Sequence, residues 1–334
     1  MQTVCICGGG SLGTVCAGVF GESYRINLLT QRPECWNPRI QVFDAQQNCF
    51  ECTFNCISSN PADCIADADI VLLCLPGYLI EDKLRQIAPF LKADAKVGSI
   101  VSSTGFFFFA HDILPQGSRL FGFQRVPFIA RVLEYGHSAN ILGYKKELKI
   151  VIENDPHAQS FASELSRIFR APVHILDSFY EVSFTNSNPI LHTSRLYNLF
   201  SGWDGGIFAE NPLFYEDWTD ADSRLILQMD SEFMELVGAL PIKKGSIPAL
   251  KDYYEVADAE GFTAKIHSIT AFKGIKSPMK EVDGGYVPDK GSRYFTEDFA
   301  FGLRWIVEYC DKYGIPAPSL HHVYDWGCKF VKSV

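Results

Sequence analysis

Short apolar runs alternate with helix-like segments over the first half of the chain. Patterns of buried strands cover residues 2–7, 25–30, 69–75 and 96–102, and helix-like segments cover residues 11–21, 60–66 and 80–91. This alternation predicts parallel strands joined by crossover helices in a doubly wound sheet. Residues 121–154 then read as strands and turns, and a helix over 156–170 precedes a last strand, PVHILD.

The second half of the chain has a different pattern. Long helical windows cover residues 188–199, 220–240 and 296–313, and prolines and glycines mark the connections between them. A chain of 334 residues is about twice the common domain size. We therefore predict an α/β domain over residues 1–180 and an all-α domain over residues 181–334.

Charge and composition narrow the class of partner. The formal net charge is -9, and the sequence has no run of Lys or Arg that would form a local basic patch. A phosphate backbone would repel such a chain, so we expect no nucleic-acid partner. No apolar stretch is long enough to cross a bilayer, and the start lacks the pattern of a secretory signal. We expect a cytoplasmic protein that has no membrane partner. The sequence leaves open whether the protein forms a homodimer.

The 11 cysteines are better explained as reduced thiols than as a disulfide framework. Cys49, Cys52 and Cys56 lie within eight residues, a density that raises the question of a metal site. Their segment, QVFDAQQNCFECTFNCIS, reads as two strands around a turn, and no fourth ligand stands at a familiar spacing. We predict a β-hairpin with free thiols and no bound metal.

The first strand runs into a glycine motif. In VCICGGGSLG, Gly8, Gly10 and Gly13 have the spacing G-x-G-x-x-G between a strand and a helix. In a Rossmann fold the first glycine permits the tight turn, the second lets the backbone approach a pyrophosphate, and the third lets the helix pack on the strand. The N–H groups at the helix start, around Ser11 and Leu12, would bind the diphosphate of a nicotinamide dinucleotide.

The end of the second strand bears on the choice between NAD and NADP. An acidic residue there would bind the ribose 2′-hydroxyl, but the sequence INLLTQRP has none. Thr30 can donate a hydrogen bond and Arg32 can pair with a 2′-phosphate. We therefore predict a preference for NADP(H), with NAD(H) as the alternative; an Arg32 that points into solvent is the competing interpretation.

Two further loops lie at the carboxyl edge of the predicted sheet, where such folds place their ligands. Leu75 and Pro76 follow one strand and are expected to flank the nicotinamide and its ribose. Thr104 follows the next strand and is a candidate substrate contact. The four phenylalanines after it, residues 106–109, suit either the core or a pocket wall.

The helical domain begins with NSNPILHTSRLYN, in which Pro189 suits a helix start and His192 follows one turn later. A lone histidine in a helix is more often structural than catalytic, but a second segment, KGSRYFTEDFAFGLRW, gives it a context. Together with GGGSLG and RVPFIARVLEYG, these segments make the chain resemble the opine dehydrogenases, the octopine and nopaline dehydrogenase family. The resemblance spans essentially the whole chain.

That resemblance implies a Rossmann domain followed by a helical domain of the 6-phosphogluconate dehydrogenase C-terminal type. It also implies that an amino acid's amine is condensed with a 2-keto acid and reduced with NAD(P)H. His192 matches the family's catalytic histidine, Asp298 the aspartate that pairs with it, and Arg293 the arginine that holds the keto-acid carboxylate. Gln124, at the end of a sheet strand, is expected to add a polar substrate contact.

Other interpretations stay open from the sequence alone. Glu297 competes with Asp298 as the partner of His192. Phe128 stands where the family pattern has tryptophan, so the identity of the two substrates is open. A 2-keto acid reductase of the ketopantoate reductase or glycerol-3-phosphate dehydrogenase kind would use a lysine of the helical domain, and a non-catalytic NADP(H)-binding protein would turn nothing over.

Overall fold

The protein is described here by a computed structural model, which describes residues 1–332. The chain divides into two compact units, residues 1–183 and 184–334. The boundary predicted from the sequence lies three residues earlier, after residue 180. Each unit has its own core.

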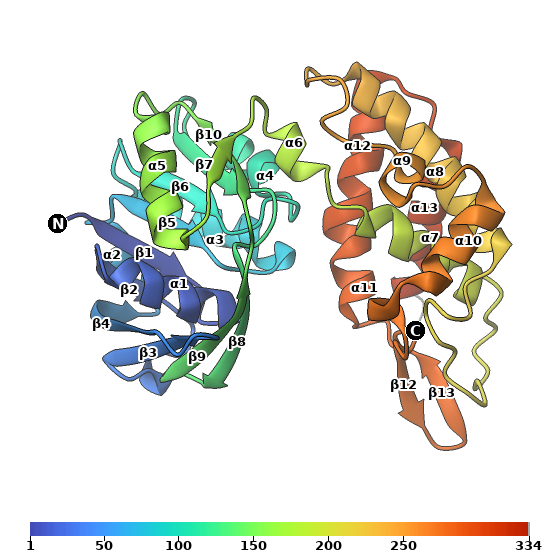
Figure 1. Ribbon diagram of the computed structural model, residues 1–334, viewed down its shortest axis with the longest axis horizontal. Helices are drawn as coiled ribbons and strands as arrows, with labels where there is room; N and C mark the ends of the chain where they lie inside the picture. Colours follow the sequence, from blue (N-terminus) through green and yellow to red (C-terminus); the bar gives the residue numbers. More distant parts are fainter. Residues whose placement is uncertain (333–334) are drawn as a thin grey trace. The chain divides into compact units, whose positions relative to one another are not determined.

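One continuous sheet organises the first unit (Figure 1). Its central strands follow the order β4-β2-β1-β5-β6-β7 and are all parallel, which is the strand order of a Rossmann fold. The predicted doubly wound sheet is therefore confirmed. The strands are β1 (Thr3–Cys7), β2 (Arg25–Leu29), β3 (Arg39–Asp44), β4 (Cys49–Ser58), β5 (Ile70–Leu73), β6 (Lys96–Ser99), β7 (Arg119–Phe123), β8 (Phe128–Glu134), β9 (Ser138–Tyr144), β10 (Leu148–Glu153) and β11 (Val173–Ile175).

Both faces of this sheet are covered by helices. α1 and α5 pack together on one face, and α2, α3 and α4 cover the other. The phenylalanines of α4 are all buried, so the four-phenylalanine run belongs to the core. The helices are α1 (Ser11–Gly21), α2 (Pro61–Ile65), α3 (Ile80–Ile87), α4 (Phe106–Ile113), α5 (Ala158–Phe169) and α6 (Tyr180–Ser183), with 3₁₀ turns η1 (Pro33–Cys35), η2 (Gly77–Leu79) and η3 (Ala88–Phe90).

The cysteine-rich segment forms the predicted hairpin. β3 pairs antiparallel with β4, and β4 continues into the parallel sheet beside β2. Alternation along the strand leaves Cys49 exposed and Cys52 buried, so their side chains lie on opposite faces. All eleven cysteines are free thiols, and residues 1–332 contain no group of three or more His, Cys, Asp or Glu that could hold a metal ion.

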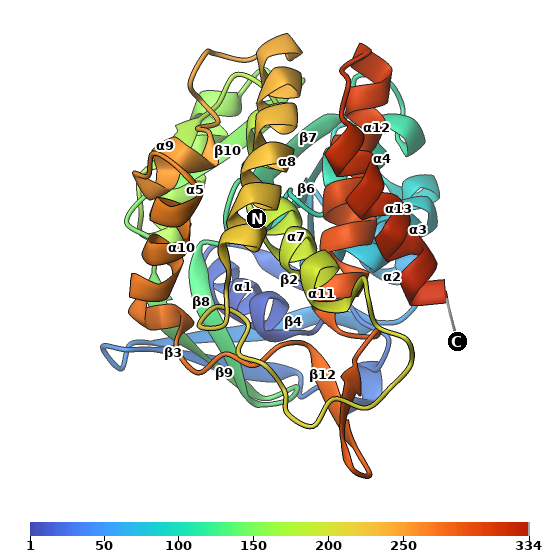
Figure 2. The ribbon, with the colours of Figure 1, turned by 90° about the vertical axis from the view of Figure 1, so that its right-hand side faces the viewer.

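The second unit is mainly helical (Figure 2). α7, α8 and α13 pack on one another, and α12 packs against both α8 and α13. α8 starts with a capping box in which Thr219 and Asp222 exchange side-chain and backbone hydrogen bonds. The helices are α7 (Asn188–Phe200), α8 (Asp220–Ala239), α9 (Leu250–Tyr254), α10 (Ala259–Ser268), α11 (Arg293–Thr296), α12 (Arg304–Tyr313) and α13 (Pro318–Lys332), with the 3₁₀ turn η4 (Thr270–Phe272).

Two features of this unit differ from the prediction. The expectation of an all-α domain is wrong for one hairpin, in which β12 (Met279–Val282) pairs antiparallel with β13 (Gly285–Pro288) around Gly284, whose φ is +86°. The helix predicted over 296–313 is broken into α11, a π-helical turn η5 (Asp298–Leu303) and α12. A π-helical turn is rare and is frequent at functional sites.

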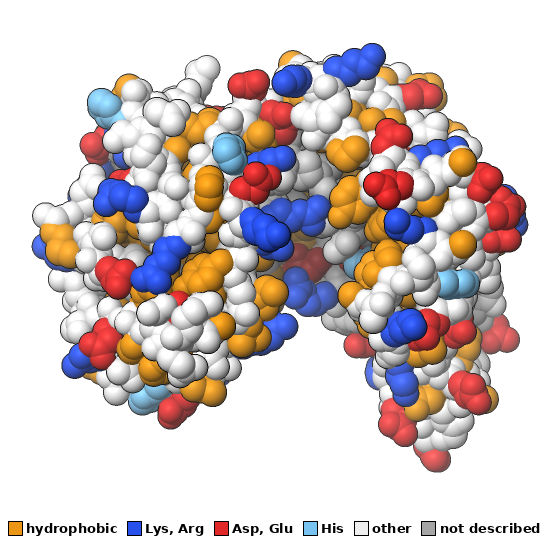
Figure 3. All heavy atoms as spheres, in the orientation of Figure 1, with side chains coloured by type: hydrophobic (Ala, Val, Ile, Leu, Met, Phe, Trp, Pro, Cys, Tyr) orange, Lys and Arg blue, Asp and Glu red, His pale blue; other side chains and the backbone are white. Residues whose placement is uncertain are grey.

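Acidic and basic side chains are interspersed with uncharged ones over the visible face of this unit (Figure 3). No helix among residues 1–332 combines the length and apolarity needed to cross a membrane.

Candidate active site

A glycine-lined cradle joins β1 to α1. Gly8 has φ +111°, and a Cβ there would lie 2.7 Å from the Cys74 carbonyl oxygen. A Cβ on Gly13 would lie 1.9 Å from the Gly8 carbonyl oxygen, so only glycine lets the helix start pack this closely. Nothing lies within 4 Å of the Cβ position of Gly10, which leaves open space above the free N–H groups of α1. These features fit a dinucleotide pyrophosphate.

A cavity of about 500 Å³ adjoins the cradle. Six of the predicted cofactor-binding residues line it: Gly8, Gly10, Thr30, Arg32, Leu75 and Pro76. The other three, Ser11, Leu12 and Gly13, belong to the start of α1, where the Ser11 hydroxyl accepts a hydrogen bond from the Val132 amide and Leu12 packs on the core. Leu12 and Gly13 could therefore contact a dinucleotide only through their backbone N–H groups, whereas the Ser11 hydroxyl keeps its own proton to donate.

Arg32 is exposed but does not simply extend into solvent. Its guanidinium carbon lies 4.7 Å from the centroid of the Tyr135 ring, a cation–π contact that holds the side chain at the cavity. Tyr135 was not predicted, because it lies in a strand connection more than a hundred residues along the chain. Lys83 and Asp82 of α3 also line the cavity and were likewise missed. Periodicity marks them only as positions on a surface helix.

The structure brings His192 and Asp298 together although 106 residues separate them. His192 lies on α7 and Asp298 begins the π-helical turn, and Nδ1 of the histidine is 2.8 Å from Oδ2 of the aspartate. Their side chains are only 11% and 15% exposed, so water screens the pair weakly. The carboxylate bonded to Nδ1 is Asp298, not its neighbour Glu297.

Aromatic side chains surround His192. The Tyr294 ring centroid lies 4.6 Å from that of the imidazole, and the Phe214 ring meets it edge-on at 5.6 Å. The hydroxyl oxygen of Tyr215 is 3.0 Å from Nε2. Sequence reasoning missed Phe214 and Tyr215, because nothing in the irregular segment NPLFYEDW predicts that it lies against α7. It also gave no role to Tyr294, although this residue directly follows Arg293 in the segment that was singled out. Burial and the nearby Asp298 raise the pKa of Tyr294.

A buried ion pair supports the same helix. Arg195, one turn after His192 on α7, lies 2.7 Å from Asp222 of α8, and both side chains are nearly inaccessible. Burial lowers the pKa of Arg195, and the neighbouring Asp222 opposes that shift. The guanidinium also donates to the carbonyl oxygens of Phe214 and Asp217. This cation therefore fixes the segment that carries Tyr215.

The proposed substrate-binding residues lie in both units. Arg293 starts α11 directly before Tyr294; it is exposed, and within residues 1–332 no acidic side chain forms an ion pair with it. In the first unit, Gln124 donates from Nε2 to the Glu181 carbonyl oxygen at 3.2 Å, and the Thr104 hydroxyl donates to the Val101 carbonyl oxygen at 3.2 Å. Gln124 keeps a second N–H for a substrate, whereas Thr104 would have to exchange its bond to Val101 in order to donate to one.

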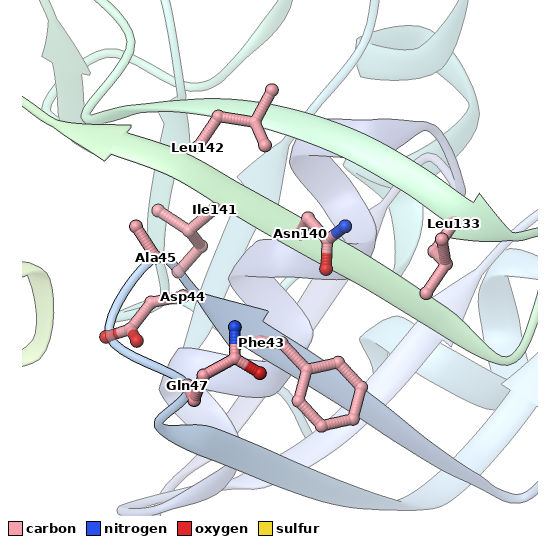
Figure 4. A pocket seen from close by; sticks show the side chains of 8 residues that line it. All are labelled: Phe43, Asp44, Ala45, Gln47, Leu133, Asn140, Ile141 and Leu142. Atoms are coloured by element: carbon pink, nitrogen blue, oxygen red, sulfur yellow. The ribbon is translucent and has the colours of Figure 1, made fainter.

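A second hollow, of about 430 Å³, is lined by residues of the paired strands β3 and β9, by Leu133 of β8 and by the turn after β3 (Figure 4). Its carboxylate, Asp44, accepts hydrogen bonds from the Gln46 and Asn48 amides, the Asn48 side chain and the Tyr144 hydroxyl. Burial raises the pKa of Asp44, but these hydrogen bonds outweigh it and lower the pKa overall. Asp44 thus stabilises the hairpin turn, and none of the predicted site residues lines this hollow.

Comparison with known proteins gives consistent matches. The family described as "NAD/NADP octopine/nopaline dehydrogenase, alpha-helical domain" matches residues 175–331. Octopine dehydrogenase of Mizuhopecten yessoensis is 26% identical over 97% of this chain and 88% of its own. Tauropine dehydrogenase of Arabella iricolor is 24% identical over 99% of this chain and 92% of its own.

A solved structure of octopine dehydrogenase with NADH and L-arginine has the same fold. It superposes with a TM-score of 0.85 at 23% identity, over 99% of this chain and 90% of that one. The likeness extends across the Rossmann sheet and the helical unit, which confirms the predicted fold class.

Proposed function

We infer that the chain is a member of the opine dehydrogenase family, and we propose that it condenses the amine of an amino acid with a 2-keto acid and reduces the resulting imine. The observation that carries the proposal is the His192–Asp298 pair, a proton-transfer group held in a weakly solvated aromatic site. The two named relatives are an octopine dehydrogenase and a tauropine dehydrogenase.

NADP(H) is the proposed cofactor. Gly8, Gly10 and Gly13 with the start of α1 would hold its diphosphate, and Thr30 and Arg32 would bind the 2′-phosphate of the ribose. Leu75 and Pro76 line the same cavity and would flank the nicotinamide ribose. When bound, the reduced nicotinamide supplies the hydride that reduces the imine carbon.

Arg293 is the proposed anchor of the keto acid. Its planar guanidinium suits a carboxylate, and no acidic residue of the described chain competes for it. Because the next residue, Tyr294, packs on His192, an acid held by Arg293 would be close to the proton-transfer group. Gln124 and Thr104 are proposed as further polar contacts to the substrate.

Proton transfers in the reaction are assigned to His192. An amino acid arrives mainly as its ammonium form, which has no lone pair, so a base must remove a proton before nitrogen can attack the keto carbon. His192 takes this proton and becomes an imidazolium, which the adjacent Asp298 stabilises. The same proton, returned to the carbinolamine oxygen, lets that oxygen leave as water when the imine forms.

The reaction is tested by a matrix of keto acids against amino acids that follows the absorbance of NADPH. We expect oxidation only where both substrates are present. Oxidation by a keto acid alone would favour the 2-keto acid reductase. That rival has little support among its candidate lysines, because Lys243, Lys244 and Lys251 are exposed and Lys265 pairs with Glu255. NADPH binding without any turnover would favour the non-catalytic protein.

The cofactor preference is tested with Arg32→Gln. Hydrogen bonds to a charged group contribute about 1.5–3 kcal/mol, so kcat/KM for NADPH should fall roughly 10- to 100-fold while kcat/KM for NADH stays the same. Arg39→Gln is the matched control, because Arg39 is an exposed arginine that pairs with Glu51 away from the cavity. A wild-type protein that prefers NADH would contradict this proposal and leave the condensation reaction standing.

A further inference from the structure

Both ring nitrogens of His192 are bonded to side chains of the second unit. Nδ1 lies 2.8 Å from Asp298 and Nε2 lies 3.0 Å from the Tyr215 hydroxyl oxygen. A carboxylate can only accept, so in the neutral ring Nδ1 carries the proton and Nε2 is an acceptor. The Tyr215 hydroxyl therefore donates to Nε2, the one nitrogen that could still take a proton.

Several contacts hold Tyr215 in this position. Its ring stacks on Phe272 with centroids 4.0 Å apart and planes 13° apart, and only 5% of the residue is exposed. Arg195 donates to the Phe214 carbonyl oxygen at 3.0 Å and to the Asp217 carbonyl oxygen at 2.8 Å, one on each side of Tyr215. α7 thus presents His192 and, one turn later, clamps the segment that carries its partner.

We propose that Tyr215 relays protons between His192 and the substrate amine, an assignment that rests on the proposed condensation. Nε2 can exchange a proton with a substrate only through the hydroxyl that occupies it or after that hydroxyl is displaced. The stacked ring and the clamped backbone oppose displacement, so the structure favours the relay.

The relay is a double proton transfer. An N–H bond of the substrate ammonium breaks and its proton bonds to the Tyr215 oxygen, while the Tyr215 O–H bond breaks and its proton bonds to Nε2. Tyr215 stays neutral, and the positive charge moves from the amine to the imidazolium beside Asp298. Burial and the neighbouring Tyr294, Tyr254 and Asp298 raise the pKa of Tyr215, so a separate tyrosinate is disfavoured and the two transfers are coupled.

Tyr215→Phe tests the relay, because it keeps the stacked ring and removes only the hydroxyl. We expect kcat to fall by about 10²-fold, the usual contribution of a positioned proton-transfer group, while the Kd for NADPH is unchanged. Tyr253→Phe, at an exposed tyrosine, is the matched control and should leave kcat as in wild type.

A readout independent of turnover comes from ¹⁵N NMR of histidine-labelled protein, with His192 identified by its loss in His192→Asn. We expect a protonated Nδ1 and an unprotonated Nε2 whose resonance moves in Tyr215→Phe but not in Tyr253→Phe. An unchanged kcat in Tyr215→Phe would overturn the relay, and so would a loss of kcat accompanied by loss of the Nδ1–Asp298 hydrogen bond, which would mark a structural role. If wild type lacks amine-dependent turnover, the condensation fails and the relay falls with it, whereas the NMR still reports whether Tyr215 donates to Nε2.

Discussion

Replacing Asp298 by asparagine removes the charge beside His192 and keeps the size of the side chain. Two unit charges about 4 Å apart in a medium of effective dielectric constant about 20 attract each other by about 4 kcal/mol. His192 and Asp298 are close to this geometry, at 2.8 Å between Nδ1 and Oδ2 with little exposure. The imidazolium formed during the reaction would lose most of this stabilisation, and about 4 kcal/mol corresponds to roughly a thousandfold in rate.

We therefore expect kcat/KM of Asp298→Asn for the keto acid and amine to fall by about 10²- to 10³-fold, the lower value allowing for the hydrogen bond that asparagine retains. Steady-state kinetics at saturating NADPH measure the effect, and titration with NADPH checks that its Kd is unchanged, since the dinucleotide cavity belongs to the other unit. Glu297→Gln removes the adjacent carboxylate and is the matched comparison. A smaller loss in Asp298→Asn than in Glu297→Gln would refute the assignment of Asp298.

Three further outcomes are expected. Gly13→Ala should weaken NADPH binding and lower the Tm, because its Cβ would lie 1.9 Å from the Gly8 carbonyl oxygen; an unchanged Kd for NADPH would contradict the cradle. Arg195→Met should destabilise the protein by about 3–5 kcal/mol in urea unfolding, because it leaves Asp222 buried without its cation; the exposed Arg39→Met should have little effect. Burial raises the pKa of Asp230 to about 6, above its unfolded value, so the contribution of its protonated form to stability is present below about pH 4 and is lost as the pH rises through 6. The stability of Asp230→Asn relative to wild type should therefore increase across this window, by up to about 3 kcal/mol. A pH-independent difference between the two proteins would contradict this expectation.

Local sequence patterns predict most of the first unit, with the exception of α4. The strand before GGGSLG and the apolar runs that follow it predict the parallel core. Strands buried on both faces are continuously apolar, and this pattern is visible in the local sequence without knowledge of the neighbouring strands. The cysteine hairpin is also predicted from its local pattern. Helix α4 is not, because a run of four phenylalanines has no helical periodicity and forms a helix only through its packing in the core.

The active site depended on contacts that local patterns do not contain. His192 and Asp298 were named together only through the resemblance, because a separation of 106 residues leaves no spacing signal. Tyr215 lies in an irregular segment whose position depends on Arg195, so its part in the site became visible only with the tertiary contacts. The π-helical turn at Asp298 also breaks a pattern that reads as one continuous helix.

The central claim is that an amine and a keto acid condense to an imine and that the imine carbon, formerly the keto carbon, receives the hydride. Incubation with a reactive keto acid and amino acid pair and with NADPH deuterated on the transferred position, followed by mass spectrometry, tests it directly. The account predicts a secondary amine that contains both substrates and carries the deuterium on the former keto carbon. A deuterated 2-hydroxy acid, with the amino acid recovered unchanged, would contradict it.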